Sequence, residues 1–379
     1  MKRAGVGRFG RRDLVRGGGA IALAGALDAL FAAPLSSQAQ QSPVSVPVVD
    51  HLAVRVLVDS YQIAVAPSFK IDNVQVERFG WPLSDAPPDK AIVCEFGLSM
   101  HVESRKGDQT RNVLVDFGFT SNALNNNLEL LSVDPASLDA LVLSHGHYDH
   151  FGGMVGFLRA AVGKLKPGTP FVIGGEECFC ARQWTAPPAP GNFGALDRSA
   201  IEAARLTLVS AEQPALLADH AMITGQVPAV TFEKVLSPSK MTVGVSGGFG
   251  CYPEKLPEDE RQATTIPDKF RHEIATVYNL KDRGLIVLTS CSHRGVVNVV
   301  QRAQAVSGVA KVHAILGGFH LAPFNDDYVR QVIASLKAID PDYIVPMHCT
   351  GEPFWDIARA EMPGKLLRAY TGTRFVFDA

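Results

Sequence analysis

The sequence has little net charge, few cysteines and no long apolar run beyond its first forty residues. It contains 36 lysine and arginine residues and 38 aspartate and glutamate residues. Because this balance leaves no basic surplus to neutralise phosphates, we expect no nucleic-acid partner. The six cysteines lie far apart except in Cys178-x-Cys180. This spacing excludes a dense disulfide framework but leaves one or two bridges open.

The sequence also lacks an internal repeat of fixed period and a Gly-x-Ser-x-Gly nucleophile element. Ser144 and Ser292, which neighbour the histidines considered below, are therefore interpreted as structural or supporting residues. What the chain does have is length and hydrophobic content. With 379 residues, 46% of them hydrophobic, it can bury the core of one large domain or two ordinary ones.

Residues 1–39 have the pattern of an export signal. Arg11 and Arg12 precede a weakly apolar run at 20–35, which contains Asp28. This run is shorter than the ~20 apolar residues that span a membrane, and small residues after it offer a cleavage site. The pattern resembles a twin-arginine signal. It predicts a periplasmic protein whose signal is bound by the export machinery and which has no stable membrane anchor.

We expect a linker at residues 40–50 and one folded domain at 51–379. Within that domain, residues 185–267 are rich in Pro, Gly and Ala, which predicts a loop-rich insertion over a binding site. The remainder alternates strand-like runs, polar loops and helix-like segments, which is typical of an α/β fold. Gly107-Asp108 punctuates two strand-like runs as a hairpin turn does.

The clearest helical pattern lies at residues 325–340. Asn325 or Asp326 is available as its N-cap, and its apolar side chains recur at helical spacing. This apolar face consists of Val329, Val332, Ile333 and Leu336.

The motif "SHGHYDH" places His145, His147, Asp149 and His150 directly after an apolar run. Residues two apart point to the same side of an extended chain, so His145 and His147 can converge on one ion. Imidazole and carboxylate ligands suit Zn²⁺, with Fe or Mn as alternatives. Three further histidines follow strand-like runs and are candidate partners: His293, His320 and His348. The histidines outside the cluster are interpreted as core or surface residues: His51, His101, His220, His272 and His313.

The motif His145-x-His147-x-Asp149-His150 resembles the metal motif of the metallo-β-lactamase superfamily. The segments "GLSMHVE", "VLVDFGFTSNALNNNLELL", "TSCSHRGVVN", "ILGGFHL" and "HCTG" are similar to the branch named for dihydropterin-ribofuranosylaminobenzene-5′-phosphate synthase. The resemblance runs from about Leu52 to the C-terminus. It implies an α/β fold of the metallo-β-lactamase type, an αββα sandwich of two mixed β-sheets flanked by helices.

The resemblance also implies two metal sites with distinct ligands. The first site would be formed by His145, His147 and His293, and the second by Asp149, His150 and His348. Many members bridge their ions with an aspartate, but this chain has Leu316-Gly317-Gly318-Phe319 at that place. His320 then either binds the second ion or contacts substrate, and Asp149 and His320 are the predicted catalytic residues.

Substrate residues of the branch are not fully matched. A glutamate and an arginine are expected around the "TG..P" element, where this chain has Gln226 and Ala229. Arg294-Gly295 and Thr350-Gly351 precede helix-like segments, whose free N–H groups favour anions. An anionic small-molecule substrate is thus one option.

Cys291 and Cys349 lie near ligand histidines, and thiolates bind zinc well. In strand geometry Cys291 would share a face with His293, whereas Cys349 would point away from His348. The favoured interpretation is that both support the ligands, although ligation by one of them stays open.

The sequence therefore predicts a hydrolase, or a transferase acting at phosphate, that uses a hydroxide held by two divalent ions, most simply Zn²⁺. The alternatives are a synthase-like transferase of the resembling branch, a mononuclear iron enzyme acting on sulfur compounds, and a metal-binding protein without turnover.

Overall fold

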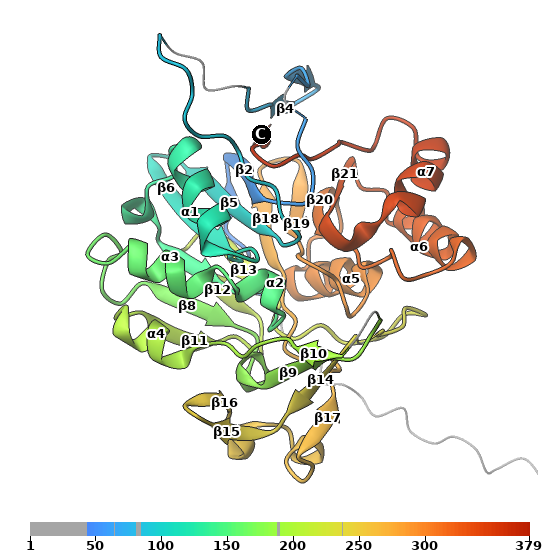
Figure 1. Ribbon diagram of the computed structural model, residues 1–379. Coiled ribbons are helices and arrows are strands. Elements are labelled where there is room, and N and C mark those ends of the chain that lie inside the picture. Colours follow the sequence, from blue (N-terminus) through green and yellow to red (C-terminus); the bar gives the residue numbers. More distant parts are fainter. Residues whose placement is uncertain (1–43, 64, 81–84, 188–189, 237) are drawn as a thin grey trace, which may run out of the picture. The chain divides into compact units, whose positions relative to one another are not determined.

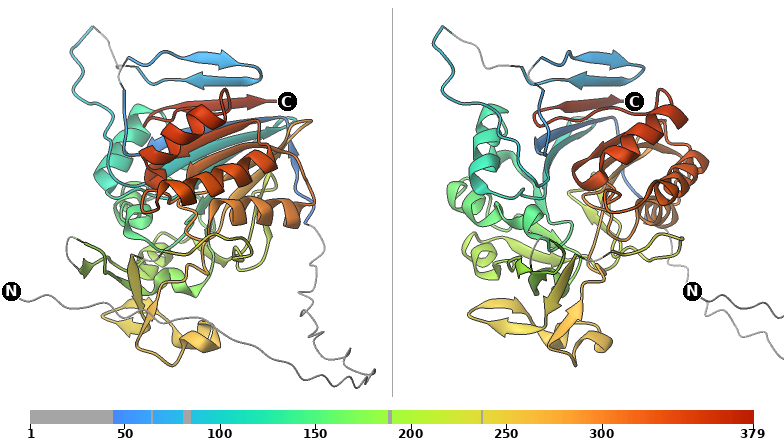
Figure 2. Two further views of the ribbon diagram at one scale, coloured as in Figure 1. Left: turned by 90° about the vertical axis from the view of Figure 1, so that its right-hand side faces the viewer. Right: turned by 45° about the vertical axis from the view of Figure 1, so that its right-hand side comes forward.

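The computed structural model describes residues 44–63, 65–80, 85–187, 190–236 and 238–379. The predicted export signal at 1–39 lies outside these residues. Residues from Ser42 onward form one compact unit. Two mixed β-sheets pack face to face with helices on both outer surfaces, which confirms the expected αββα sandwich (Figures 1 and 2). None of the described helices has the length and apolarity needed to cross a membrane.

The larger sheet takes up nine of the described strands, in the order β11-β8-β7-β6-β5-β2-β22-β4-β3. Their bounds in that order are Thr207–Ser210, Pro170–Ile173, Ala140–Val142, Gln109–Val115, Ser99–Lys106, His51–Val58, Arg374–Asp378, Val74–Glu77 and Phe69–Ile71. β5 and β6 form the predicted hairpin, in which Lys106 pairs with Gln109. Gly107 in its turn has a φ of 55°, a conformation that glycine adopts without strain. β6, β7 and β8 run parallel.

The second sheet takes up seven described strands, with β12-β13-β18-β19-β20-β21 in line and β1 paired to β18. Their bounds are Ala215–Leu217, Ala221–Ile223, Thr276–Leu280, Gly284–Leu288, Val312–Gly318, Tyr343–Met347 and, for β1, Val48–Val49. β19, β20 and β21 run parallel, so their carboxyl ends meet at one edge. β1 falls within the segment that the sequence assigns to a linker.

Helices cover the outer face of each sheet, as the right-hand view of Figure 2 shows. Those beside the larger sheet are α1 (Ser121–Leu130), α2 (Tyr148–Phe151), α3 (Met154–Ala160) and α4 (Arg198–Ala203). Those beside the second sheet are α5 (Val296–Ser307), α6 (Asp326–Ile339) and α7 (Glu352–Glu361). The helix predicted at 325–340 is confirmed, because Asn325 caps α6 and its four predicted apolar residues are buried.

Three buried layers hold these elements together. Side chains from the inner faces of both sheets form the central core. A second cluster packs α1 and α3 against the larger sheet, and a third packs α5, α6 and α7 against the second sheet. Close packing on both faces explains why the parallel strands read as continuous apolar runs in the sequence.

The segment at 185–267 contributes more strands than the sequence indicates. It supplies β11 to the larger sheet and β12 and β13 to the second sheet. It also supplies three strands of a small sheet with the order β10-β9-β14-β17. These are β10 (Gly191–Asn192), β14 (Ser239–Thr242) and β17 (Thr265–Pro267), and β9 (Ala181–Trp184) comes from just before the segment. A hairpin of β15 (Gly244–Ser246) and β16 (Phe249–Cys251) adjoins it, and a disulfide joins Cys180 to Cys251. Short 3-10 turns lie at Pro135–Ser137, Glu176–Phe179, Pro253–Lys255, Glu258–Glu260 and His348–Thr350.

Candidate metal centre

The loop after β7 brings His145 and His147 together, beyond the strand end at Val142. Their ring centroids lie 5.0 Å apart. Gly146 separates them, and a Cβ at that position would lie 2.4 Å from Arg182 Nη1. The close approach of the buried arginine therefore favours glycine between the two histidines.

His293 completes the first triad, a name we use for His145, His147 and His293. Its ring centroid lies 4.9 Å from that of His145 and 4.8 Å from that of His147. One ligand atom of each residue lies within 4.8 Å of the others. Burial lowers the pKa of all three imidazoles, to about 3 for His147. The triad thus presents neutral imidazoles, the form in which histidine binds a metal ion.

The hydroxyl of Ser144 orients His145. Ser144 Oγ donates to Asp116 Oδ2 at 2.8 Å and lies 3.0 Å from His145 Nδ1. Because its own proton is committed to Asp116, the hydroxyl accepts the Nδ1 proton of His145. The Nε2 atom then carries a lone pair, and it has no hydrogen-bond partner among the described residues.

A second serine orients His147 in the same way. Ser239 Oγ donates to Asp268 Oδ2 at 3.4 Å and lies 3.0 Å from His147 Nε2. The hydroxyl accordingly accepts the Nε2 proton, which leaves the lone pair of His147 on Nδ1. Asp268 is buried and accepts a hydrogen bond from Arg182 Nε at 2.6 Å, so its charge is paired.

His272 supports the motif loop from behind. Its Nε2 accepts hydrogen bonds from Gly146 N–H at 3.1 Å and from Arg182 Nη2 at 3.0 Å. Its Nδ1 therefore carries the proton and donates to Glu177 at 2.7 Å. The sequence places His272 outside the cluster, and it is indeed a hydrogen-bonded core histidine, but it also fixes the backbone between two ligands.

His293 is held by a ring and a carboxylate. The Phe270 ring stacks on it with centroids 3.8 Å apart and an angle of 6°. Glu273 accepts from the N–H groups of His293 at 2.8 Å and Arg294 at 2.7 Å. Burial raises the pKa of Glu273 to about 7. Both ring nitrogens of His293 lack hydrogen-bond partners among the described residues.

The second triad, Asp149, His150 and His348, also converges. Asp149 Oδ2 lies 3.5 Å from His150 Nε2 and 3.2 Å from His348 Nε2. Asp149 and His150 lie in α2, and His348 directly follows β21. Although burial opposes ionisation, the two histidines hold the pKa of Asp149 well below its usual range.

Asp116 links the two triads. Besides accepting from Ser144, its Oδ2 lies 2.7 Å from His150 Nδ1. Burial alone would lower the pKa of His150, but Asp149 and Asp116 raise it to about 10. Without a metal ion His150 therefore carries a second proton between two carboxylates. An ion bound at Nε2 would displace that proton.

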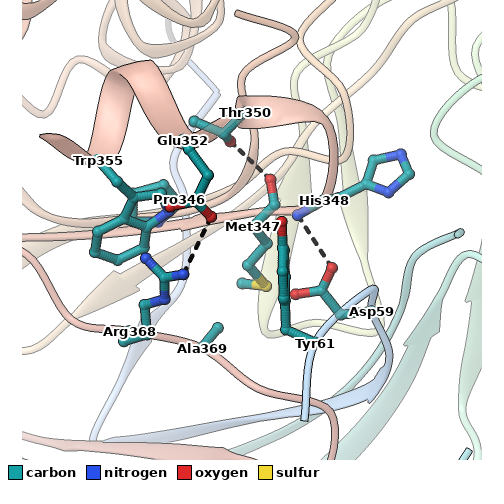
Figure 3. Close-up of a pocket in the computed structure, with 11 residues that line it drawn as sticks. Asp59, Tyr61, Pro346, Met347, His348, Thr350, Glu352, Trp355, Arg368 and Ala369 are labelled. Carbon is teal, nitrogen blue, oxygen red and sulfur yellow. Dashed lines mark hydrogen bonds and ion pairs between the residues drawn. The ribbon is translucent and has the colours of Figure 1, made fainter. Parts of the chain in front are cut away.

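Asp59 fixes the backbone of His348. Its Oδ1 accepts from His348 N–H at 3.1 Å, and burial raises the pKa of Asp59 to about 6. Figure 3 shows Asp59 beside a cavity that Tyr61 and Arg368 also line, while the His348 ring points away from it. The cavity has a volume of about 20 Å³, enough for roughly one water molecule. It is too small to be a substrate site.

Four polar residues at the centre have the left-handed backbone conformation, which is uncommon for residues other than glycine. Their φ angles are 59° at Asp116, 57° at Ser292, 47° at His320 and 51° at His348. Such conformations cost about 1–3 kcal/mol each and persist only where the surroundings enforce them. The chain therefore uses packing energy to aim these side chains.

His320 and the two nearby cysteines lie against both triads. The His320 ring centroid is 4.1 Å from that of His293, so His320 adjoins the first triad. Its side chain is half-buried, unlike the triad residues. The expectation that Cys349 points away from His348 is wrong, because their ligand atoms and Cys291 Sγ lie within 4.8 Å of one another. His348–Thr350 forms a 3-10 turn, to which strand alternation does not apply.

The donor atoms fit metal ions. Buried polar atoms without hydrogen-bond partners are rare and costly, yet several gather at this centre within the described residues. They are His145 Nε2, Asp149 Oδ1, both ring nitrogens of His293, His320 Nδ1 and both ring nitrogens of His348. Ligands of one zinc ion at about 2.0–2.2 Å lie roughly 3–4 Å from each other. The separations within the second triad have this size.

One of the two predicted anion sites is already filled. Glu233 accepts from Val297 N–H at 3.2 Å and Asn298 N–H at 2.9 Å, at the N-terminus of α5. The segment after Arg294-Gly295 therefore binds a carboxylate of the chain itself. At the other segment, α7 begins after Gly351 without a side-chain cap.

The sequence profile of the metallo-β-lactamase superfamily matches residues 95–165. The chain is 26% identical over 284 residues to the 7,8-dihydropterin-6-methyl-4-(β-D-ribofuranosyl)-aminobenzene-5′-phosphate synthase of Methanocaldococcus jannaschii, covering 74% of this chain and 89% of that protein. It is also 26% identical over 271 residues to an uncharacterised protein of the same organism, covering 71% and 89%.

Among solved structures, a metal-dependent hydrolase of the β-lactamase superfamily superposes with a TM-score of 0.61. The two chains share 20% identity, and the match covers 85% of this chain and 98% of the other. At this identity the superposition supports the fold.

Proposed function

We propose that the chain is a metal-dependent hydrolase of the metallo-β-lactamase superfamily that acts at its two triads. The observation that carries this proposal is the convergence of ligand atoms in two adjoining groups, with unpartnered donors in each. A merely structural cluster would satisfy those donors with the chain's own hydrogen bonds.

Two divalent ions held there would polarise a substrate oxygen and lower the pKa of a coordinated water from about 16 to about 7. The chain's own residues orient the reactants and move protons. Asp149 Oδ1 has no hydrogen-bond partner among the described residues, so it is free to accept a hydrogen bond from the attacking water. His320 is half-buried beside His293, and we assign it contact with the substrate and proton transfer to the leaving group.

Two partly exposed aromatic rings suggest what the substrate carries. Phe96 is 57% exposed and its ring lies 4.9 Å from that of His348. Phe193 is half-buried and its ring lies 5.2 Å from that of His147. Each ring touches a ligand and retains open surface, so we propose a small substrate with an apolar or aromatic part beside its hydrolysable bond.

Metal analysis followed by a panel of phosphoesters, lactones and β-lactams tests the function. We expect close to two ions per chain and hydrolysis of at least one ester class that ceases on chelation and returns with metal. A protein that binds no metal under metal-replete expression would contradict the proposal.

His320→Gln separates substrate contact from ligation. If His320 contacts the substrate, the variant should keep both ions, its kcat/KM should fall and one limb of its pH–rate profile should be lost. Loss of an ion from the variant would instead make His320 a ligand.

A second candidate is transfer at a phosphorylated substrate, favoured by the similarity to the named synthase over 89% of that relative. The substrate contact is in doubt because Gln226 Nε2 donates to Gly174 O at 3.2 Å, and Ala229 carries no charge. Formation of a new bond to an aromatic amine, measured by product mass, would favour the transferase. Release of inorganic phosphate or alcohol alone would favour the hydrolase.

We also propose export to the periplasm, because a disulfide joins Cys180 and Cys251 and such bridges persist in oxidising compartments. Replacing Arg11 and Arg12 with Lys is expected to hold the full-length precursor in the cytoplasm. Undiminished periplasmic appearance of the double variant would contradict a twin-arginine signal.

A further inference from the structure

Cys291 is a buried sulfur that the reaction outlined above does not use. It lies two residues before His293, in the loop that follows β19, and its exposed fraction is 2%. Its Sγ lies 3.2 Å from His150 Nε2, the nitrogen that faces Asp149. A side chain that served packing alone would not need to place its sulfur beside a nitrogen that can bind a metal ion.

The sulfur lies between the two triads. Its Sγ and the ligand atoms of His145 and His150 are all within 4.8 Å of one another, so this group contains one residue from each triad. Cys291 Sγ forms a second group of the same size with His293 and His320. Cys291 is therefore placed to contact an ion in either triad.

The distance to His150 suits ligation. Zinc binds thiolate sulfur at about 2.3 Å and imidazole nitrogen at about 2.0–2.1 Å, so two such ligands of one ion lie roughly 3–4 Å apart. The Sγ to Nε2 distance of 3.2 Å falls in this range. Without metal, the same distance corresponds to a hydrogen bond, which is the competing explanation.

Charge balance gives an independent reason for a further anionic ligand. The two triads contain five imidazoles, which bind metal as neutral ligands, and a single carboxylate, Asp149. Two divalent cations in adjoining sites repel strongly in a buried environment. A thiolate between them would offset more of this repulsion than another neutral ligand.

On the premise of the metal-dependent function above, we propose that Cys291 would bind, as a thiolate through Sγ, an ion held at these triads. The thiol releases its proton to solvent as the sulfur–metal bond forms, and no electrons are transferred. Sulfur ligands favour zinc over the oxygen-preferring Mn²⁺ and Mg²⁺. A sulfur ligand therefore argues against Mn²⁺, one of the two alternatives to zinc that the sequence leaves open.

Cys349 provides a matched control. Its Sγ lies 3.4 Å from Cys291 Sγ and 3.7 Å from Cys291 O, and its side chain is half-buried. Both side chains are thiols at nearly the same place. Cys349 is grouped with His348 and Cys291, whereas Cys291 is the sulfur grouped with His145 and His150.

Cobalt substitution tests the sulfur ligand without an activity measurement. Co²⁺-loaded wild type is expected to show sulfur-to-cobalt charge transfer in the near ultraviolet together with the ligand-field bands of bound cobalt. Cys291→Ser should lose the charge-transfer band, and Cys349→Ser should keep it. X-ray absorption of the zinc-loaded wild type should show a sulfur neighbour at about 2.3 Å, which requires no variant to fold.

Chelator competition measures how much Cys291 contributes to metal affinity. We expect Cys291→Ser to lose metal at a chelator concentration at least roughly 10-fold lower than wild type, since even residues that only support ligands change affinity 10- to 100-fold. Bound cobalt with no charge-transfer band in wild type would overturn the ligand while leaving the metal function intact. Loss of the band only in Cys349→Ser would move the ligand to Cys349, and failure of wild type to bind any metal would overturn both proposals.

Discussion

His145 and His147 of the first triad are oriented through serine hydroxyls, whereas His150 of the second triad contacts the carboxylate of Asp116 directly. In the first triad burial keeps the imidazoles neutral. In the second triad the neighbouring carboxylates raise the pKa of His150 to about 10, against the effect of burial. The first triad thus offers imidazole lone pairs that are already free. In the second triad, His150 must lose a proton before its Nε2 can bind a metal ion. The difference teaches that similar ligand spacing in a sequence can conceal opposite charge states.

The largest expected effect comes from removing a ligand of either triad. His147→Ala should lose at least the ion of the first triad and His348→Ala that of the second. Each should reduce hydrolysis by more than the roughly 100-fold seen for residues that only support ligands. Metal content per chain and kcat/KM are the measurements. His51→Gln is the control and should retain both ions. His51 lies in β2 and is hydrogen-bonded to Asp378 of β22. Equal metal loss in all three variants would show that the effect is not local.

The carboxylates behind the ligands should give the next largest effect and distinguish the triads. Asp116→Asn should weaken metal binding in both triads, because Asp116 contacts His150 directly and His145 through Ser144. Asp268→Asn should affect the first triad alone through Ser239. We expect losses of roughly 10- to 100-fold in affinity, measured by chelator competition. The comparison fails if Asp268→Asn weakens both ions equally.

Acid should destabilise the metal-free protein through the first triad. The pKa of His145, His147 and His293 is lowered by burial, so these groups stay neutral when folded but protonate when unfolded below about pH 6.5. The contribution of each first-triad histidine to stability is therefore complete above about pH 6.5 and falls below it, by up to about 1.4 kcal/mol per pH unit. The raised pKa values of Asp59 and Glu273 act in the opposite direction, so the measured slope is the difference between the two effects. Thermal unfolding in chelator measures this slope.

Variants in each triad sharpen that pH test. His293→Asn should flatten the slope, because one neutral buried imidazole is gone. His150→Ala should not, since the raised pKa of His150 gives stability that is complete below about pH 6.5 and lost only as pH rises toward 10. The lowered pKa of Asp149 likewise matters only below about pH 4. A flattened slope in His150→Ala would contradict the assigned charge states.

The smallest expected effect concerns Phe96, one of the two partly exposed aromatic rings beside the ligands. Phe96→Ala removes a ring that is 57% exposed and contacts His348. KM should rise by roughly 5- to 30-fold, which corresponds to the roughly 1–2 kcal/mol gained by burying part of such a ring. Metal content and kcat should change little. Loss of metal from Phe96→Ala would mean that the ring supports His348 rather than substrate.

The ligand residues were predictable because the motif and the later histidines all follow apolar strand runs. The orienting residues were less visible. Asp59 and Asp116 end two apolar runs, "AVRVLVD" and "NVLVD", and a buried strand that closes on a lone aspartate is a usable signal. Glu273 and His272 carry no such signal, since their role depends on contacts with residues remote in sequence.

Strand order was beyond the sequence for the same reason. Periodicity identifies a strand, but its neighbours are chosen by packing over long separations. β22 enters the larger sheet between β2 and β4, and no local pattern announces that position. The backbone of His348 shows the limit at a single residue. Strand alternation placed Cys349 wrongly because the chain leaves the strand in a 3-10 turn.

The position of β22 also has a consequence for how the chain folds during its synthesis. Val376 pairs with Ala53 on one side and with Gln75 on the other, so the last described strand fills a slot between two early ones. While the ribosome still holds residues 374–378, β2 and β4 have open edges facing that slot, and open edges invite pairing with other chains. The larger sheet can close only after synthesis has passed Asp378. A chain shortened before Arg374 should consequently be retained by chaperones or aggregate, even though every metal ligand is present.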